Sequence, residues 1–232
     1  MLEGEIAVLL VAARTRLTGI QTNLPHKIPA GGVSKTAKIP FNALCCREGL
    51  IWRAEELGRS ACDSFEKHDM VAGVLLTRGF FETAAALWHL KVTIERQLEM
   101  GIEADLDSQI LQVILGHRSE PSLPKAVGVL TFIDRLTKTF PLARSKYDAM
   151  SEYAHPNWMG AAFPFSVIDK EALVVTFGRG VRGGDYHARL GLTCLLDGLH
   201  VAERAYNEIA DLMPKFIEAC EADLARRAPS PP

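Results

Sequence analysis

The chain has 232 residues, of which 48% are hydrophobic, and its formal net charge is −2. This length and hydrophobic content suit one domain with a full core, and two separate cores are not expected. The nearly neutral charge excludes a global basic field that would drive non-specific nucleic-acid binding, so any RNA binding would need a local patch.

Helical periodicity dominates the first two thirds of the chain. Apolar residues at helical spacing predict an N-terminal helix over 3–20, within a segment 1–24. Prolines, Gly31 and Gly32 predict a flexible connector over 25–40. The helices predicted after it cover 41–67, 69–100, 104–116, 125–139 and 142–154.

The pattern changes after residue 160. Alternating apolar residues on both sides of Asp169-Lys170-Glu171 predict a β-hairpin at about 161–178. Asp185 is expected to cap a long helix over 186–213, which Pro214 separates from a short last helix. The fold class is therefore mainly α, a multi-helix bundle over 41–225 with one small β-hairpin insertion. Residues 226–232 are expected to form a disordered tail.

The cysteines and the first residues of the chain bear on its compartment. Five cysteines without a C-x-x-C pair are typical of a reducing compartment, and we expect them to fill the core. The histidines lack metal-binding spacing, so neither a metal nor a cofactor is expected. Glu3 and Glu5 stand where a signal peptide carries positive charge, and no run of about 20 apolar residues is found. A cytoplasmic protein without membrane contact is predicted.

Two polar groups are candidate sites on helices. Arg78, Glu82 and His89 share one stripe of an otherwise apolar helix, which predicts either a buried ion pair that fixes helix register or an anion clamp. On a later helix, one face carries Arg144, Asp148, Ser151 and His155. If the two faces meet, they form a cleft suited to acid–base chemistry on a phosphodiester.

The segment around Pro156 stands out. Pro156 disfavours helical geometry at His155, so the helix should end there and leave His155 and Asn157 at its exposed end. His155 would equally suit a helix-terminal cap.

A third candidate is the glycine-rich segment 178–183, which matches G-x-G-x-x-G. No second strand follows its helix, so it is not a dinucleotide fingerprint. Arg179 and Arg182 beside a helix N-terminus could hold a phosphate, while the alternative is a flexible connector.

Four segments carry a resemblance to a known superfamily. They are Leu76-Thr77-Arg78-Gly79-Phe80-Phe81-Glu82, Leu115-Gly116-His117-Arg118, Val129-Leu130-Thr131 to Asp134, and Tyr153-Ala154-His155-Pro156-Asn157-Trp158-Met159-Gly160. In this order they resemble a group of uncharacterised bacterial helical proteins that is similar to the HEPN superfamily (higher eukaryotes and prokaryotes nucleotide-binding domains). The HEPN ribonuclease signature, an arginine followed after four to six residues by a histidine, is matched only by Arg182 and His187.

The resemblance implies a HEPN-like bundle, often dimeric, from a superfamily with many ribonucleases of toxin–antitoxin and phage-defence systems. We therefore expect a homodimer that binds or acts on RNA or nucleotides, with a partner protein encoded nearby. The activity that the resemblance implies is that of a metal-independent ribonuclease. In that role Arg78 would hold a phosphate, Glu82 would orient Arg78, His155 would act as acid or base, and Asn157 would donate a hydrogen bond. The alternative is a non-catalytic interaction protein in which these residues form a structural lock. A third hypothesis places a small nucleotide at the glycine-rich segment.

Overall fold

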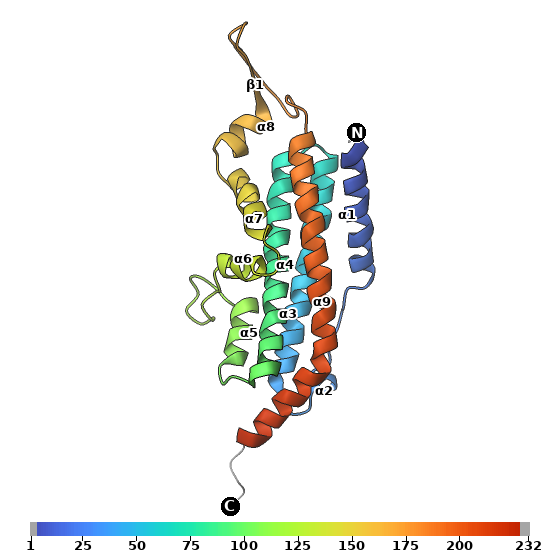
Figure 1. Ribbon diagram of the computed structural model, residues 1–232, viewed down its shortest axis with the longest axis vertical. Helices are drawn as coiled ribbons and strands as arrows, with labels where there is room; N and C mark the ends of the chain where they lie inside the picture. The colour runs from blue at the N-terminus through green and yellow to red at the C-terminus, as the bar shows by residue number, and fades with distance from the viewer. Residues whose placement is uncertain (1–3, 228–232) are drawn as a thin grey trace, which may run out of the picture.

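The computed structural model describes residues 4–227, and three long helices form its centre (Figure 1). These are α3 (Lys38–Glu66), α4 (Met70–Met100) and α9 (Asp185–Arg227), and both α3 and α9 pack along α4. The N-terminal helix α1 (Gly4–Thr22) packs against α9 and α3. Its buried apolar residues belong to the same core as those of the long helices. The N-terminal helix is thus part of the bundle.

A row of short helices lies along the side of α4 that faces away from α1 (Figure 1). In chain order they are α5 (Leu106–Ile114), α6 (Val129–Thr137) and α7 (Ala143–Ser151). Helix α5 contacts α3, whereas α6 and α7 contact α4. The ends of α5 and α6 fall short of the predicted ranges because residues 115–128 form a long loop between them.

Helix α4 is the central element because it is apolar on all sides. Buried residues occur at nearly every position from Phe80 to Ile94, as a helix enclosed by neighbours requires. Among the described residues, α4 is the one helix long and apolar enough to cross a membrane. Most of that stretch is buried within the bundle, as is common in the core helix of a folded domain, so its composition alone is weak evidence for a membrane span.

Close packing between the long helices depends on glycine. Phe65 of α3 is fully buried, and its ring lies against Gly73 of α4 and Gly191 of α9. A Cβ atom would lie 2.5 Å from the Phe65 ring at Gly73 and 2.2 Å from it at Gly191. These distances are much shorter than van der Waals contact, so the three helices can pack around the Phe65 ring because positions 73 and 191 are glycine. A larger residue at either position would displace the ring.

The β-hairpin extends beyond one end of the bundle (Figure 1). Strands β1 (Ser166–Asp169) and β2 (Val174–Phe177) pair antiparallel, which confirms the prediction of a mainly α fold with one small hairpin. The strands are shorter than the predicted 161–178. A 3₁₀ turn (Glu152–Ala154), a π-helical turn (Trp158–Ala162) and the short helix α8 (Phe163–Phe165) precede them.

Three further sequence-based boundaries differ from the structure. The connector contains a short helix, α2 (Ala30–Val33), and α3 begins at Lys38. The interruption expected at Pro214 is wrong, because α9 continues to Arg227 with Pro214 inside it. A proline removes one backbone hydrogen bond and bends a helix, and α9 bends toward its C-terminal end (Figure 1). Burial of Met213 and Phe216 on both sides of the proline offsets that loss. Of the expected tail, 226–227 are helical and 228–232 lie outside the described residues.

Candidate functional site

The structure brings Arg78 and Glu82 together with two residues of α7. The Nη2 of Arg78 donates to the hydroxyl of Tyr147 at 2.7 Å and pairs with Oε1 of Glu82 at 3.1 Å. Its Nε donates to the hydroxyl of Ser151 at 3.1 Å. The Tyr147 hydroxyl in turn donates to Glu82 Oε1 at 3.1 Å. We call these four residues the α4–α7 network.

The α4–α7 network is largely shielded from solvent. The side chains of Arg78 and Glu82 are only 28% and 25% exposed, and Tyr147 is buried. The guanidinium also lies 5.1 Å from the centre of the Tyr147 ring, a cation–π distance. Its bonds run within the protein and join α4 to α7.

His155 and Asn157 do not reach this network. The backbone at His155 is extended and the residue is exposed, so it has left the helical face that it was expected to share with Ser151. Asn157 caps the π-helical turn, where its Oδ1 accepts from Met159 N and Gly160 N. Pro156 accounts for this arrangement, because it ends the helical geometry one residue before itself.

Arg144 and Asp148 also lie outside the expected cleft. They pair with each other at 3.0 Å, and Arg144 pairs with Asp134 of α6, all on the surface. The cleft of one arginine, two carboxylates and a histidine does not form among the described residues.

The two arginines of the glycine-rich segment do not converge on a phosphate site. Arg179 pairs with Asp69 at 2.6 Å. Arg182 donates from Nε to the carbonyl oxygen of Ser166 at 2.6 Å and lies over the rings of Trp158 and Phe163. Both guanidinium groups thus support the base of the hairpin.

Arg182 and His187, which match the HEPN ribonuclease signature, do not form a solvent-exposed pair. His187 is 3% exposed, and its Nδ1 lies 2.7 Å from the hydroxyl of Tyr153. The Phe163 ring contacts both Arg182 and His187, 5.1 Å from the first and 5.2 Å from the second. Burial lowers the pKa of His187, which favours a neutral imidazole.

A wide groove lies beside the α4–α7 network and encloses about 730 Å³. We call it the Arg53 groove. It is bordered by α3, α4, the end of α5, the loop 115–128 and the start of α6. Its polar lining residues are Arg53, Glu82, Thr83, His117, Arg118 and Ser119. Its apolar lining residues are Leu50, Ala86, Val113, Ile114, Ala126, Val127, Val129 and Phe132.

The loop that forms one wall is held by backbone contacts. His117 N donates to Pro124 O at 2.8 Å, and Ala126 N donates to His117 O at 3.3 Å. Gly116 allows this closure, because a Cβ atom there would lie 2.2 Å from Gln112 O and 2.6 Å from the Cα of Ala126. The local fold of this loop presents His117 and Arg118 to the groove.

The Arg53 groove is cationic. Among the residues that the structure describes, Glu82 is the only carboxylate in its lining, and the α4–α7 network neutralises it. Arg53 donates to the Thr83 hydroxyl at 3.1 Å, and within residues 4–227 neither Arg53 nor Arg118 forms an ion pair. Two arginines over an apolar floor can hold an anionic group that also carries an apolar or aromatic part.

A half-buried histidine lies behind this groove. His89 stacks edge-on against Phe132, with ring centres 4.9 Å apart, and its Nε2 lies 3.5 Å from Arg135. Burial, together with the positive charges of Arg135 and Arg96, lowers the pKa of His89 to about 4. His89 is therefore neutral near pH 7. It supports the Phe132 ring that lines the groove.

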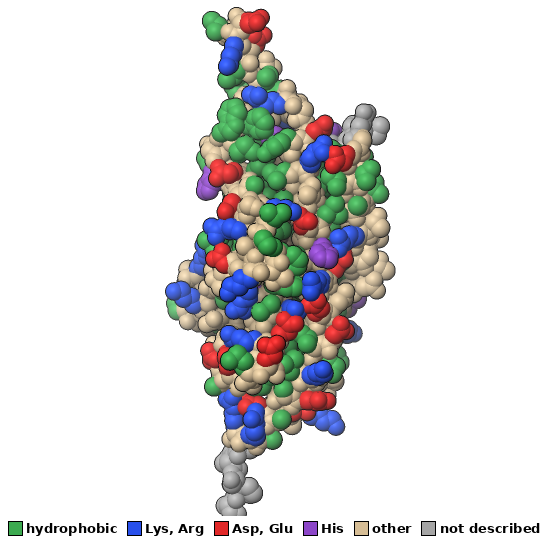
Figure 2. Space-filling view, viewed as in Figure 1, with side chains coloured by type: hydrophobic (Ala, Val, Ile, Leu, Met, Phe, Trp, Pro, Cys, Tyr) green, Lys and Arg blue, Asp and Glu red, His purple; other side chains and the backbone are tan. Residues whose placement is uncertain are grey.

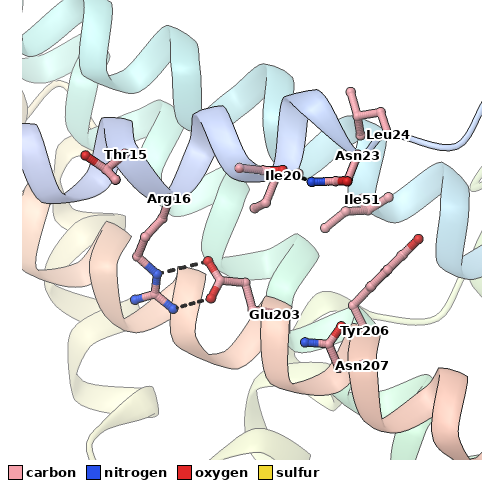
Figure 3. Close-up of a pocket in the computed structure, with 10 residues that line it drawn as sticks. Thr15, Arg16, Ile20, Asn23, Leu24, Ile51, Glu203, Tyr206 and Asn207 are labelled. Carbon is pink, nitrogen blue, oxygen red and sulfur yellow. Dashed lines mark hydrogen bonds and ion pairs between the residues drawn. The ribbon is translucent and has the colours of Figure 1, made fainter.

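A second groove, between α1, α3 and α9, differs in its charge (Figure 3). It encloses about 550 Å³, and Arg16 pairs there with both oxygens of Glu203 at 2.9 and 2.7 Å. The hydroxyl of Tyr206 donates to Glu48 at 2.7 Å. Because the charged groups of its lining neutralise each other, this groove has less attraction for a charged ligand than the Arg53 groove.

Sequence reasoning missed Arg53 and Tyr147. Arg53 is one of several charged residues on α3, and nothing in its spacing separates it from a solvated face. Tyr147 lies four residues before Ser151, which already marked the same helical face, so its place on that face could have been read from the sequence. Its contact with Arg78 depends on how α7 docks on α4.

Comparisons with protein-family models, curated proteins and solved structures found no match for this chain.

Proposed function

We propose that this is a HEPN-like helical protein that binds RNA or a nucleotide in the Arg53 groove. One observation carries the proposal: three of the four segments that resemble the HEPN-like group contribute residues to this single groove. Glu82 comes from the first segment, Gly116, His117 and Arg118 from the second, and Val129 and Phe132 from the third. Segments far apart in the sequence therefore meet at the groove whose positive charge suits an anionic ligand.

The chemistry of the groove suits a phosphate attached to a base. Arg53 and Arg118 offer guanidinium donors for phosphate oxygens, which arginine binds in a bidentate fashion. Phe132 offers an aromatic surface, and bases stack on such surfaces in proteins that bind single-stranded nucleic acid. The net charge of −2 leaves local positive charge as the source of attraction for a phosphate.

Binding without cleavage is the better supported activity. The residues expected to carry catalysis are divided between the α4–α7 network and the exposed segment after α7. The guanidinium of Arg78 is bonded to Tyr147 and Ser151, whereas His155 is exposed and takes no part in this network. In this proposal the α4–α7 network is a structural lock that positions Glu82 and α7 beside the groove. The HEPN resemblance is the support for a role in phage defence or in a toxin–antitoxin pair.

The test is a binding titration with a labelled single-stranded RNA and, separately, with ATP. The double variant Arg53→Gln/Arg118→Gln should weaken binding at least about tenfold, because each lost charged hydrogen bond is worth about 1.5–3 kcal/mol. The matched control is Arg179→Gln/Arg182→Gln, which removes the same charge at the hairpin end. Equal weakening by both pairs would assign binding to overall charge, and weakening by the control alone would assign it to the glycine-rich segment.

A further inference from the structure

The hairpin carries an exposed apolar face that no other part of the described chain covers. Directly paired residues of an antiparallel hairpin share one face, so the pairs Ser166–Phe177 and Ile168–Val175 lie on the same side. Ile168 is 53% exposed, Val175 46% and Phe177 76%. Figure 2 shows hydrophobic side chains gathered at this end of the molecule, with charged side chains at the tip.

The outer edge of β2 is also open. Gly178 N donates to Phe165 O at 3.0 Å, which fixes the phase of the ladder. The backbone groups of Val174 and Thr176 therefore point toward β1, and those of Val175 and Phe177 point away from it. The outer edge of β1 differs, because Arg182 already donates to Ser166 O. An isolated two-stranded hairpin is marginally stable, and it gains stability from further strands.

We infer that the β2 edge is the homodimer interface, where β2 pairs antiparallel with β2 of a second copy of this chain. A two-fold axis at Thr176 places Val175 of each copy opposite Phe177 of the other, so every outward N–H meets an outward C=O. The product is a four-stranded antiparallel sheet with β2 strands at its centre. Its apolar face is continuous, because Val175 and Phe177 of the two copies become cross-strand neighbours.

Charge supports a second copy as the occupant. Asp169 at the end of β1 and Lys170 and Glu171 in the turn after it carry a net charge of −1. In the segment after β2, Arg182 bonds to the neutral backbone carbonyl of Ser166, whereas Arg179 is paired with Asp69. Antiparallel pairing brings the turn of each copy beside the arginine segment of the other. Insertion of the hairpin into a bilayer is disfavoured, because Asp169 and Glu171 at the tip would have to enter the lipid first.

The test combines sedimentation of the full chain with a crosslink. The wild-type protein should sediment as a dimer and Val175→Pro as a monomer at the same concentration. Because the N–H of Val175 points outward, a proline there leaves the β1–β2 bonds in place. Leu173→Ser, at an 88% exposed turn position, is the control that should remain dimeric. Equal melting temperatures for all three would show that the bundle is intact.

Thr176→Cys provides an independent readout. A non-hydrogen-bonded antiparallel pair has Cα atoms about 4.5 Å apart, within the range of a disulfide. Mild oxidation should give a covalent dimer with Thr176→Cys and none with Lys170→Cys in the turn. A monomeric wild-type protein would overturn the inference, and its co-sedimentation with phosphatidylserine vesicles would assign the apolar face to a membrane. A dimer that persists in Val175→Pro and shows no Thr176→Cys crosslink would place the interface elsewhere.

Discussion

The hydroxyl of Tyr147 accepts a hydrogen bond from Arg78 at 2.7 Å and donates one to Glu82 at 3.1 Å. One oxygen atom of α7 thus bridges an ion pair of α4, and it does so in a largely buried setting. Removal of this atom leaves both charges in place, with the bond from Arg78 to Ser151 as the remaining link of the network to α7. Helix docking and ion pairing should therefore make coupled contributions to stability.

Tyr147→Phe should therefore lower the free energy of unfolding by about 1.5–3 kcal/mol, the usual cost of a lost hydrogen bond to a charged partner. Arg78→Ala should cost more, about 2–4 kcal/mol, because it leaves Glu82 partly buried without its cation. Urea unfolding of the two single variants and the double variant measures both values and their coupling. Additive losses would show that Tyr147 and Arg78 act independently, against the network described here.

Acid should destabilise the protein through His89. Its folded pKa, about 4, lies below the ordinary value of about 6.5, so the unfolded chain binds the proton more readily. Stability contributed by neutral His89 is fully present above pH 6.5 and falls as the pH drops toward 4, by at most about 3 kcal/mol. Urea unfolding at pH 7 and pH 4.5 should show a smaller acid loss in His89→Gln than in wild type.

His187 should contribute to the acid loss in the same way, because burial also lowers its pKa. The acid loss that remains in His89→Gln should decrease further in a His89→Gln/His187→Gln double variant. Identical pH dependence in wild type and His89→Gln would contradict a buried neutral His89.

Substitution of Gly191 should disturb the centre of the bundle. In Gly191→Ala the new methyl group would meet the Phe65 ring at 2.2 Å, and overpacking of this kind costs about 1–3 kcal/mol. Gly19→Ala is the matched control on α1, because a Cβ atom there meets nothing within 4 Å. It should be neutral or slightly stabilising, since alanine favours a helix over glycine by about 1 kcal/mol. Thermal unfolding of both variants distinguishes packing from helix propensity.

The thiols should be protected in the folded protein. Burial raises the pKa of Cys46, Cys194 and Cys220 to about 12 and that of Cys62 to about 11. Only Cys45 is partly exposed. Labelling with a thiol reagent at pH 7.5 should modify at most Cys45 in the folded state, and all five cysteines in denaturant. Rapid labelling of several thiols without denaturant would mean that the core opens.

Elements governed by local pattern were predictable from the sequence. The apolar, evenly distributed composition of α4 identified it as the buried central helix, and the i, i+4 spacing of Arg78 and Glu82 predicted their ion pair. Apolar residues on both sides of Asp169-Lys170-Glu171 located the hairpin. Burial confirms the prediction of core residues for Cys46, Cys62, Cys194 and Cys220, whereas Cys45 is only partly buried.

Features that depend on tertiary packing were not predictable. Pro214 lies within α9 because buried residues on both sides of it outweigh one lost hydrogen bond, and no local pattern shows that balance. His155 was placed on the face of Ser151 by helical spacing, although the chain turns away before it. The Arg53 groove depends on where the loop 115–128 lies against α3, and a loop of that length has no periodicity to predict its path.

The salt dependence of RNA binding tests the proposed function most directly. Each phosphate contact with single-stranded RNA contributes about 0.7 to the slope of log affinity against log salt concentration. If Arg53 and Arg118 hold phosphates, Arg53→Gln/Arg118→Gln should bind an intact RNA oligomer more weakly and with a slope reduced by about 1.4, whereas Arg179→Gln/Arg182→Gln should keep the wild-type slope. An unchanged slope in the Arg53→Gln/Arg118→Gln protein would contradict RNA binding in the Arg53 groove.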